Sequence, residues 1–211
     1  MKTKKLYKFL RTGLRSNSGN HTWKIGEWYE EDKVSICNRG FHASKTPLQA
    51  LSYVGGEILA EVFVRGKSEI QKNKECWSEM KINKAWHWTK KDSVELSIFA
   101  AELCLKNFEK VYPKDKRPRE AIEAARKVLL NDTEENRSAA WSAASAATAA
   151  ARSGAWLASA AESGARSGAR SAAAASEWSA ESESAESAKK SLISKIDNWF
   201  IKKIKTLQKY E

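Results

Sequence analysis

Four cysteine and histidine side chains of this 211-residue chain can be drawn as one set of transition-metal ligands. Cys37 lies five residues before His42, and Cys76 lies eleven residues before His87. Zinc sites use cysteine and histidine at short, recurring separations, and neither of these is a common zinc spacing. We therefore expect no metal site. The sequence also lacks the glycine-rich fingerprints that bind phosphates and dinucleotides, so we expect no cofactor.

A second set of residues has the order needed for transfer chemistry. Arg11, Ser44 and Glu79 occur in the order of the Arg, Ser and Glu elements of ADP-ribosyltransferases, which they resemble in this respect. The resemblance implies that Arg11 and Ser44 would hold NAD and that Glu79 would bind a ribose hydroxyl. A competing interpretation gives the same region structural roles, with His42 in a turn and Glu79 at a strand edge. We keep the transferase as an alternative and expect a protein that is not an enzyme.

Residues 1–90 have the pattern of a small, basic α+β domain. Residues 57–70 alternate apolar and polar side chains and predict a half-buried strand whose inward positions begin at Ile58. Residues 46–56 predict a short helix with Thr46 as its N-cap and Pro47 at its first position. Residues 38–40 form a turn signal, and residues 80–88 predict another strand.

Residues 91–211 predict an all-α bundle. Helices are expected over 92–112 and from Pro118 to about residue 130, and either Thr133 or Asp132 caps the next one. Residues 138–188 contain 22 Ala and 13 Ser without proline. Alanine is the strongest helix former, so we expect packed helices here and not disorder. Residues 192–210 predict a last, basic amphipathic helix.

Large side chains interrupt the Ala/Ser segment at intervals and are the candidate anchors for a protein partner. Trp and Arg dominate the binding energy of protein interfaces. The expected partner-binding residues are Trp141, Arg152, Trp156, Arg166, Arg170 and Trp178.

A charged motif precedes that segment. Asp115, Arg117 and Arg119 surround Pro118, and Asp115 can pair with a neighbouring arginine at the start of the helix that Pro118 opens. We expect these residues, like Phe41 and His42 in the first half, to be structural.

Residues 115–126 read D-K-R-P-R-E-A-I-E-A-A-R. With the Ala-rich segment that follows, they resemble the Ala-rich helical immunity-protein family of bacterial toxin systems and phages, over about residues 92–190. That resemblance implies a helical binding protein. The run Cys37 to Ala43, C-N-R-G-F-H-A, is similar to a motif of an uncharacterised phage and bacterial domain, over about residues 5–85. It implies a phage setting and no known activity.

The net charge of +11 is concentrated in residues 1–90, which hold 17 Lys/Arg and 9 Asp/Glu. A basic segment with Tyr7 and Trp23 nearby leaves nucleic acid open as a partner. No run of about 18 apolar residues could span a membrane, and no signal peptide is expected. With three scattered cysteines, these features favour the reducing cytoplasm of a bacterial host.

The sequence thus predicts a non-enzymatic binding protein of phage or prophage origin. It would neutralise a toxin or a host defence component by covering its surface. A nucleic-acid-binding or nucleotide-binding protein and the transferase are the alternatives, and a homo-oligomer stays open.

Overall fold

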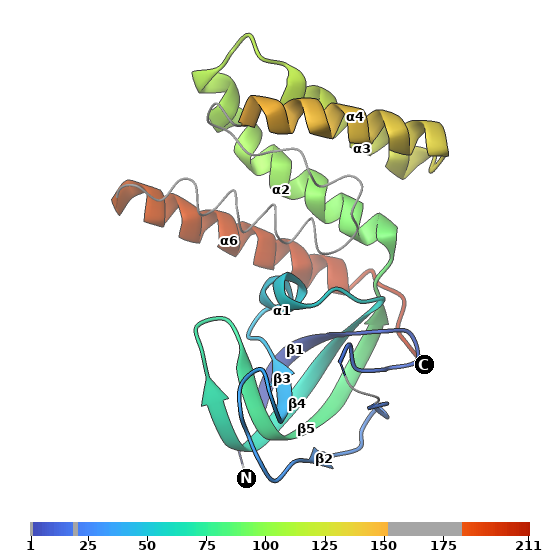
Figure 1. Ribbon diagram of the computed structural model, residues 1–211, viewed down its shortest axis with the longest axis vertical. Coiled ribbons are helices and arrows are strands. Elements are labelled where there is room, and N and C mark those ends of the chain that lie inside the picture. Colours follow the sequence, from blue (N-terminus) through green and yellow to red (C-terminus); the bar gives the residue numbers. More distant parts are fainter. Residues whose placement is uncertain (1, 19–20, 152–182) are drawn as a thin grey trace. The chain divides into compact units, whose positions relative to one another are not determined.

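The computed structural model describes residues 2–18, 21–151 and 183–211, and it has an α+β fold (Figure 1). The chain divides into two compact units. Residues 1–88 and 199–211 form the first, here called the N-terminal domain, and residues 89–198 form the second, called the helical unit. The elements are β1 (Lys4–Leu10), β2 (Tyr29–Glu30), β3 (Phe41–Ala43), α1 (Pro47–Tyr53), β4 (Ile58–Ile70), β5 (Glu75–His87), α2 (Lys90–Val111), α3 (Arg117–Leu130), α4 (Glu134–Ala151) and α6 (Glu183–Ile204).

An antiparallel sheet is the frame of the N-terminal domain. The long strand β4 lies between β1 and β5, and β5 pairs in turn with β2 and β3 (Figure 1). The predicted inward positions of β4, from Ile58 to Val64, are fully buried. The strand predicted at 80–88 begins earlier, at Glu75. The strand β1 was not predicted, because three lysines among its seven residues give it the look of a charged terminus.

The three-residue strand β3 connects the two sides of this sheet. Phe41, His42 and Ala43 pair with β5, while the next residue, Ser44, exchanges two backbone hydrogen bonds with Tyr7 of β1, at 2.8 and 2.9 Å. The order β1–β4–β5–β3 therefore returns to β1 and forms a closed ring of strands. Apolar residues of all these strands share one core, which contains Leu6, Leu10, Trp23, Ala43, Ile58, Ala60, Val62, Val64, Met80, Ile82 and Ala85.

Helix α1 has the predicted cap. The Thr46 hydroxyl accepts a hydrogen bond from the backbone N–H of Gln49, and Pro47 occupies the first turn. The helix ends at Tyr53, so Tyr53 stands at a helix terminus with its ring partly exposed.

The last residues of the chain return to the sheet. The N–H of His87 donates to the Gln208 carbonyl oxygen, and the N–H of Tyr210 donates to that of Ala85. The prediction of a helix through residue 210 is therefore wrong at its end, because α6 stops at Ile204 and the chain then extends along β5. The proposed division at residue 90 also differs from the observed one, since residues 199–211 join the N-terminal domain.

Four aromatic rings pack together where the chain leaves the N-terminal domain after residue 88 and re-enters it at residue 199. The Trp88 ring stacks on Phe200 with centroids 5.3 Å apart and meets Phe9 edge-on at 5.7 Å. The ring centroid of Trp199 lies 6.4 Å from that of Trp88. Residues 88 and 199 are thus neighbours, and the helical unit is an insertion between them.

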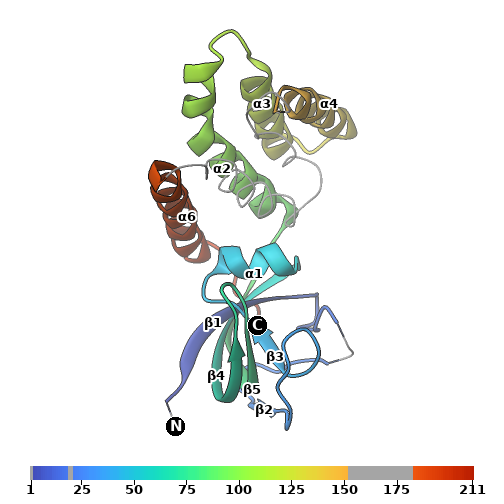
Figure 2. The same cartoon turned by 60° about the vertical axis from the view of Figure 1, so that its left-hand side comes forward.

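Within the helical unit, α3 packs against both α2 and α4 (Figure 2). Thr89 and Asp92 form a reciprocal capping box at the start of α2. Thr133, not Asp132, caps α4, because its hydroxyl accepts from the N–H of Asn136. Seven side chains form the core between α2 and α3: Val94, Ile98, Ala101, Leu105, Phe108, Ile122 and Ala125. No helix in the described part of the chain is long and apolar enough to cross a membrane.

We predict that deleting residues 205–211 lowers the free energy of unfolding of the N-terminal domain by about 2–4 kcal/mol. The deletion removes two backbone hydrogen bonds, each contributing ~1 kcal/mol, and the ring of Tyr210, which packs against the core of the domain. Urea unfolding measures the change. The exposed Lys205→Ala variant is the control and should shift stability by less than about 0.5 kcal/mol; equal stability of the deletion and this control would contradict the role given to the tail.

Candidate functional site

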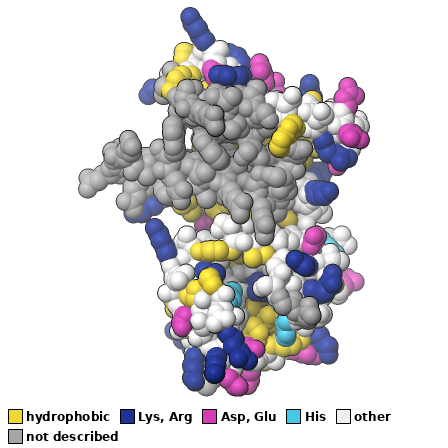
Figure 3. Space-filling view, viewed as in Figure 1, with side chains coloured by type: hydrophobic (Ala, Val, Ile, Leu, Met, Phe, Trp, Pro, Cys, Tyr) yellow, Lys and Arg dark blue, Asp and Glu magenta, His cyan; other side chains and the backbone are white. Residues whose placement is uncertain are grey.

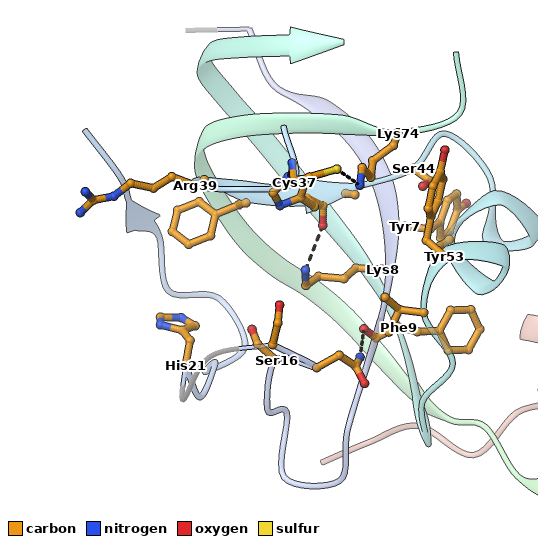
Figure 4. A pocket seen from close by; sticks show the side chains of 18 of the residues that line it. Tyr7, Lys8, Phe9, Ser16, His21, Cys37, Arg39, Ser44, Tyr53 and Lys74 are labelled. Carbon is orange, nitrogen blue, oxygen red and sulfur yellow. Dashed lines mark hydrogen bonds between the residues drawn. The ribbon is translucent and has the colours of Figure 1, made fainter. Parts of the chain in front are cut away.

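A cavity of about 650 Å³ opens in the N-terminal domain beside the closing strand β3 (Figure 4). This volume lies within the usual range of small-molecule sites, ~300–1,000 Å³. Its walls come from β1, residues 16–18, His21, Trp23, the turn and strand at 37–44, the end of α1 and Lys74. On the face drawn in Figure 3, hydrophobic side chains and histidine gather among Lys and Arg in this domain.

Lys8 projects from β1 into this cavity (Figure 4). Lys8 lies two residues from both Leu6 and Leu10, and alternate residues of a strand share a face. Its side chain therefore points toward the interior. Its Nζ donates a hydrogen bond of 2.9 Å to the carbonyl oxygen of His42. No carboxylate of the described residues forms an ion pair with it. Burial lowers the pKa of the Lys8 ammonium to about 8.

His42 is held in one orientation by the turn that precedes it. Its Nε2 accepts a hydrogen bond of 3.0 Å from the backbone N–H of Cys37. Burial, followed by the positive charges of Lys8 and Lys74, lowers the pKa of His42. The imidazole is therefore neutral near pH 7 and serves as an acceptor in the wall.

His21 has no such partner. Its ring lies edge-on against Trp23 and Tyr29, with centroids 4.5 and 4.6 Å away. Its Nε2 is buried and makes no hydrogen bond to any described residue. Burial and then the charge of Lys8 lower its pKa. A buried polar atom without a partner costs about 1–3 kcal/mol, which a ligand atom in the cavity would recover.

The wall of the cavity is electropositive. Lys8, Lys74 and Arg39 line it, and Glu31 is the one carboxylate among the described lining residues. Glu31 already accepts a hydrogen bond of 3.0 Å from Arg39. The Nζ of Lys74 donates to the sulfur of Cys37 at 3.0 Å and lies 4.9 Å from the centre of the Tyr53 ring. An anion bearing a ring matches this combination of charge and aromatic surface.

The turn beside the cavity needs glycine at position 40, for two reasons. Its φ of +104° lies in a region that side chains rarely adopt. A Cβ there would stand 2.7 Å from the sulfur of Cys76, which donates to the Arg39 carbonyl oxygen. The geometry of this turn positions both Cys37 and His42.

The three residues of the transferase alternative do not meet in one site. Arg11 follows Leu10, which pairs with Ile58, whereas Glu79 pairs with Arg65 further along β4. Seven residues of strand separate these positions, or ~23 Å at ~3.3 Å per residue. Glu79 also forms an ion pair with Arg65. Ser44 alone lines the cavity.

The cysteines and histidines considered as metal ligands have other partners. The backbone N–H of Cys37 donates to the Nε2 of His42, and the ring of His87 packs against that of Tyr210. Among the described residues, no group of three or more His, Cys, Asp or Glu side chains is placed to hold a metal ion.

The charged motif of the helical unit forms a set of ion pairs. Asp115 accepts two hydrogen bonds from the Arg117 guanidinium, and the Arg119 guanidinium reaches Glu109 of α2 at 2.7 and 2.8 Å. Arg126 pairs with Glu102, also on α2. Pro118 is buried in the first turn of α3. These contacts join the motif to α2 and to the start of α3.

Of the expected partner-binding residues, Trp141 is described and its side chain is 55% exposed. Arg152, Trp156, Arg166, Arg170 and Trp178 lie outside the described residues.

The basic N-terminal segment lacks the exposed aromatic rings that stacking on nucleic acid requires. Tyr7 and Trp23 are 6% and 3% exposed. Lys4 pairs with the buried Glu75, and Lys5 pairs with Glu61.

Three residues of the site, Lys8, His21 and Lys74, were not singled out from the sequence as site residues. A signal for Lys8 exists in the run Leu6-Tyr7-Lys8-Phe9-Leu10, where one lysine interrupts four apolar residues. His21 and Lys74 carry no such local signal, because distant pairings bring them to the cavity.

Comparison with known proteins gives one match. Residues 4–91 match the model of a family described as "Domain of unknown function (DUF7666)". No curated protein matches the chain. No solved structure matches it either. The matched segment contains the whole cavity and ends before the returning tail.

We predict that Lys8→Met stabilises the ligand-free protein at pH 7 by about 2–3 kcal/mol. The folded-state pKa of Lys8, about 8, is below its unfolded value, so the folded state disfavours the ammonium. This cost is complete below pH 8, shrinks as pH rises and is absent above ~10.5.

Urea unfolding of both proteins from pH 6 to 10.5 measures the difference. Lys5→Met is the matched control, since Lys5 lies on the same strand with its side chain exposed and paired to Glu61. A Lys8→Met advantage that does not change with pH would show that the ammonium is not the destabilising group.

Proposed function

We propose that the N-terminal domain binds a small anion that carries a ring, the class to which nucleotides belong, and that the protein is a binding protein and not an enzyme. The observation that carries this proposal is the buried ammonium of Lys8, which faces a cavity without a carboxylate partner among the described residues. Burying an uncompensated cation is costly, and proteins retain it where a ligand supplies the opposite charge.

The remaining walls support the same class of ligand. Lys74 and Arg39 add positive charge at the cavity, and His21 supplies an unused buried nitrogen. Phe41 and Tyr53 supply aromatic surface for a ring. An anionic group near Lys8 with a ring against these aromatics would satisfy each feature.

We predict that adenosine 5′-monophosphate binds the full-length protein and that Lys8→Met weakens this binding at least tenfold, because the variant removes the buried cation. Isothermal titration at pH 7 measures the affinity, with adenosine and inorganic phosphate as partial ligands that should each bind more weakly. The exposed Lys5→Met variant should bind like the wild type.

Native mass spectrometry of the protein purified from a bacterial host tests the same proposal without choosing a ligand. A released anion of nucleotide type would support it. If the protein carries no such molecule and the four nucleoside monophosphates bind no more tightly to the wild type than to Lys8→Met, the proposal is wrong.

A second proposed function concerns the helical unit and rests on its exposed apolar side chains. Trp141 is 55% exposed and Leu130, at the end of α3, is 88% exposed. We propose that residues 91–198 form an all-α bundle that covers the surface of a protein partner, a toxin or host defence component in the cytoplasm of a bacterium infected by or carrying a phage. The resemblance to the immunity-protein family supports this assignment.

We predict that Trp141→Ala abolishes recovery of a stoichiometric partner in pull-downs from such a host, because an exposed Trp is a typical interface anchor. Lys5→Met, in the other unit, should leave recovery unchanged. Equal recovery by wild type and Trp141→Ala, or no partner at all, would count against this second function.

A further inference from the structure

We propose that Lys8 captures a carbonyl group of its ligand as a reversible imine, so that the cavity takes anions that carry an aldehyde or ketone. The inference rests on the proposed function, since it assumes that the cavity admits a small ring-bearing anion. It narrows the ligand class and gives the buried amine a chemical role.

The amine has the access and the surroundings that this chemistry needs. Lys8 lines an open cavity and keeps part of its side chain exposed there. Its Nζ is held by one hydrogen bond, to the His42 carbonyl oxygen, and that bond fixes its direction (Figure 4). Because no carboxylate among the described residues binds the ammonium, no ion pair has to break before the amine reacts.

A neutral amine is the nucleophile in imine formation, and burial supplies it. With a pKa of about 8, roughly one tenth of Lys8 is neutral at pH 7, compared with roughly four parts in ten thousand for an ordinary lysine. Lysines that form imines in proteins are desolvated in this way.

The reaction needs no external oxidant or reductant. The Nζ lone pair forms a bond to the carbonyl carbon, and the electron pair of the C=O bond moves to oxygen, which takes up a proton. The nitrogen then loses a proton, and the hydroxyl leaves as water when it gains a second one. The products are one protonated imine and one water. Loss of the remaining N–H proton gives the neutral imine, and addition of water reverses the reaction.

We assign the movement of these protons to His21, which lines the same cavity. Its Nε2 is buried beside the cavity and makes no hydrogen bond to a described residue. His42 cannot serve through its Nε2, which accepts the Cys37 N–H. In the protonated imine the nitrogen keeps one N–H, which can still donate to the His42 carbonyl oxygen.

Pyridoxal 5′-phosphate is the probe, because it combines a ring, an anion and an aldehyde. The full-length protein is incubated with it at pH 7.5, treated with borohydride to fix any imine, and digested for mass spectrometry. We expect Lys8 to be modified at least tenfold faster than Lys5, and modification to saturate with concentration. Comparable rates at Lys8 and Lys5 would overturn the proposal.

Lys8→Arg keeps the positive charge and removes the nucleophile. It should lose the fast labelling, and thermal unfolding is used to confirm that it folds. His21→Gln should slow imine formation at a saturating concentration of the probe.

These measurements separate the two proposals. Slow labelling of Lys8 together with Lys8-dependent nucleotide binding would overturn the imine and leave the proposed function standing. Slow labelling without any binding of an anion would overturn both. Fast labelling that persists at an unchanged rate in Lys8→Arg would assign the reaction to another lysine.

Discussion

The short strand β3 holds the N-terminal domain together, because it is hydrogen-bonded to the sheet on both sides. Three residues pair with β5, and the backbone of Ser44 pairs with Tyr7 of β1. Without these bonds β1 and β5 would be two separated edges of an open sheet. The strand β3 also forms one wall of the cavity, so the pairing that closes the sheet also builds the site. Gly40 makes the closure sterically feasible at the turn just before it.

Polar groups at the cavity lower the stability of the domain that contains it. A lysine at an apolar position of β1 and an unpartnered His21 nitrogen both carry desolvation costs. The buried Glu75 shows the contrast, since it accepts hydrogen bonds from Lys4 and from the Trp77 indole. At the cavity, by contrast, no carboxylate of the described residues pairs with Lys8, and the His21 Nε2 makes no hydrogen bond to any of them. This difference, more than the cavity's size, marks it as a site.

The second half of the chain enters the fold as an insertion. The rings of Trp88, Trp199 and Phe200 bring residues 88 and 199 together, and the tail then extends along β5. Consequently, the edge of β5 that does not pair with β4 pairs with β3, with β2 and with the C-terminal tail. A domain defined by residues 4–91 alone would leave the end of this edge unpaired.

Local features of the sequence determined the elements whose signals are local. The Thr46 cap with Pro47, the alternation from Ile58 to Val64 and the helix opened by Pro118 each depend on a few neighbouring residues, and each was predicted. The roles of Asp115, Arg117 and Arg119 were also accessible, because a carboxylate and arginines at a helix start tend to pair.

Only the tertiary structure decided the site and the end of the chain. Lys8, His21, His42 and Lys74 are separated by as many as 66 residues and meet because β3 pairs with two distant strands. Residues 208–210 continue a basic helical pattern, yet they form bridges to β5, since the unpaired edge of a strand offers backbone bonds that a helix end does not. The sequence by itself determined the α+β class and the local caps; which polar groups lack partners, and therefore where a ligand fits, follows from long-range pairing.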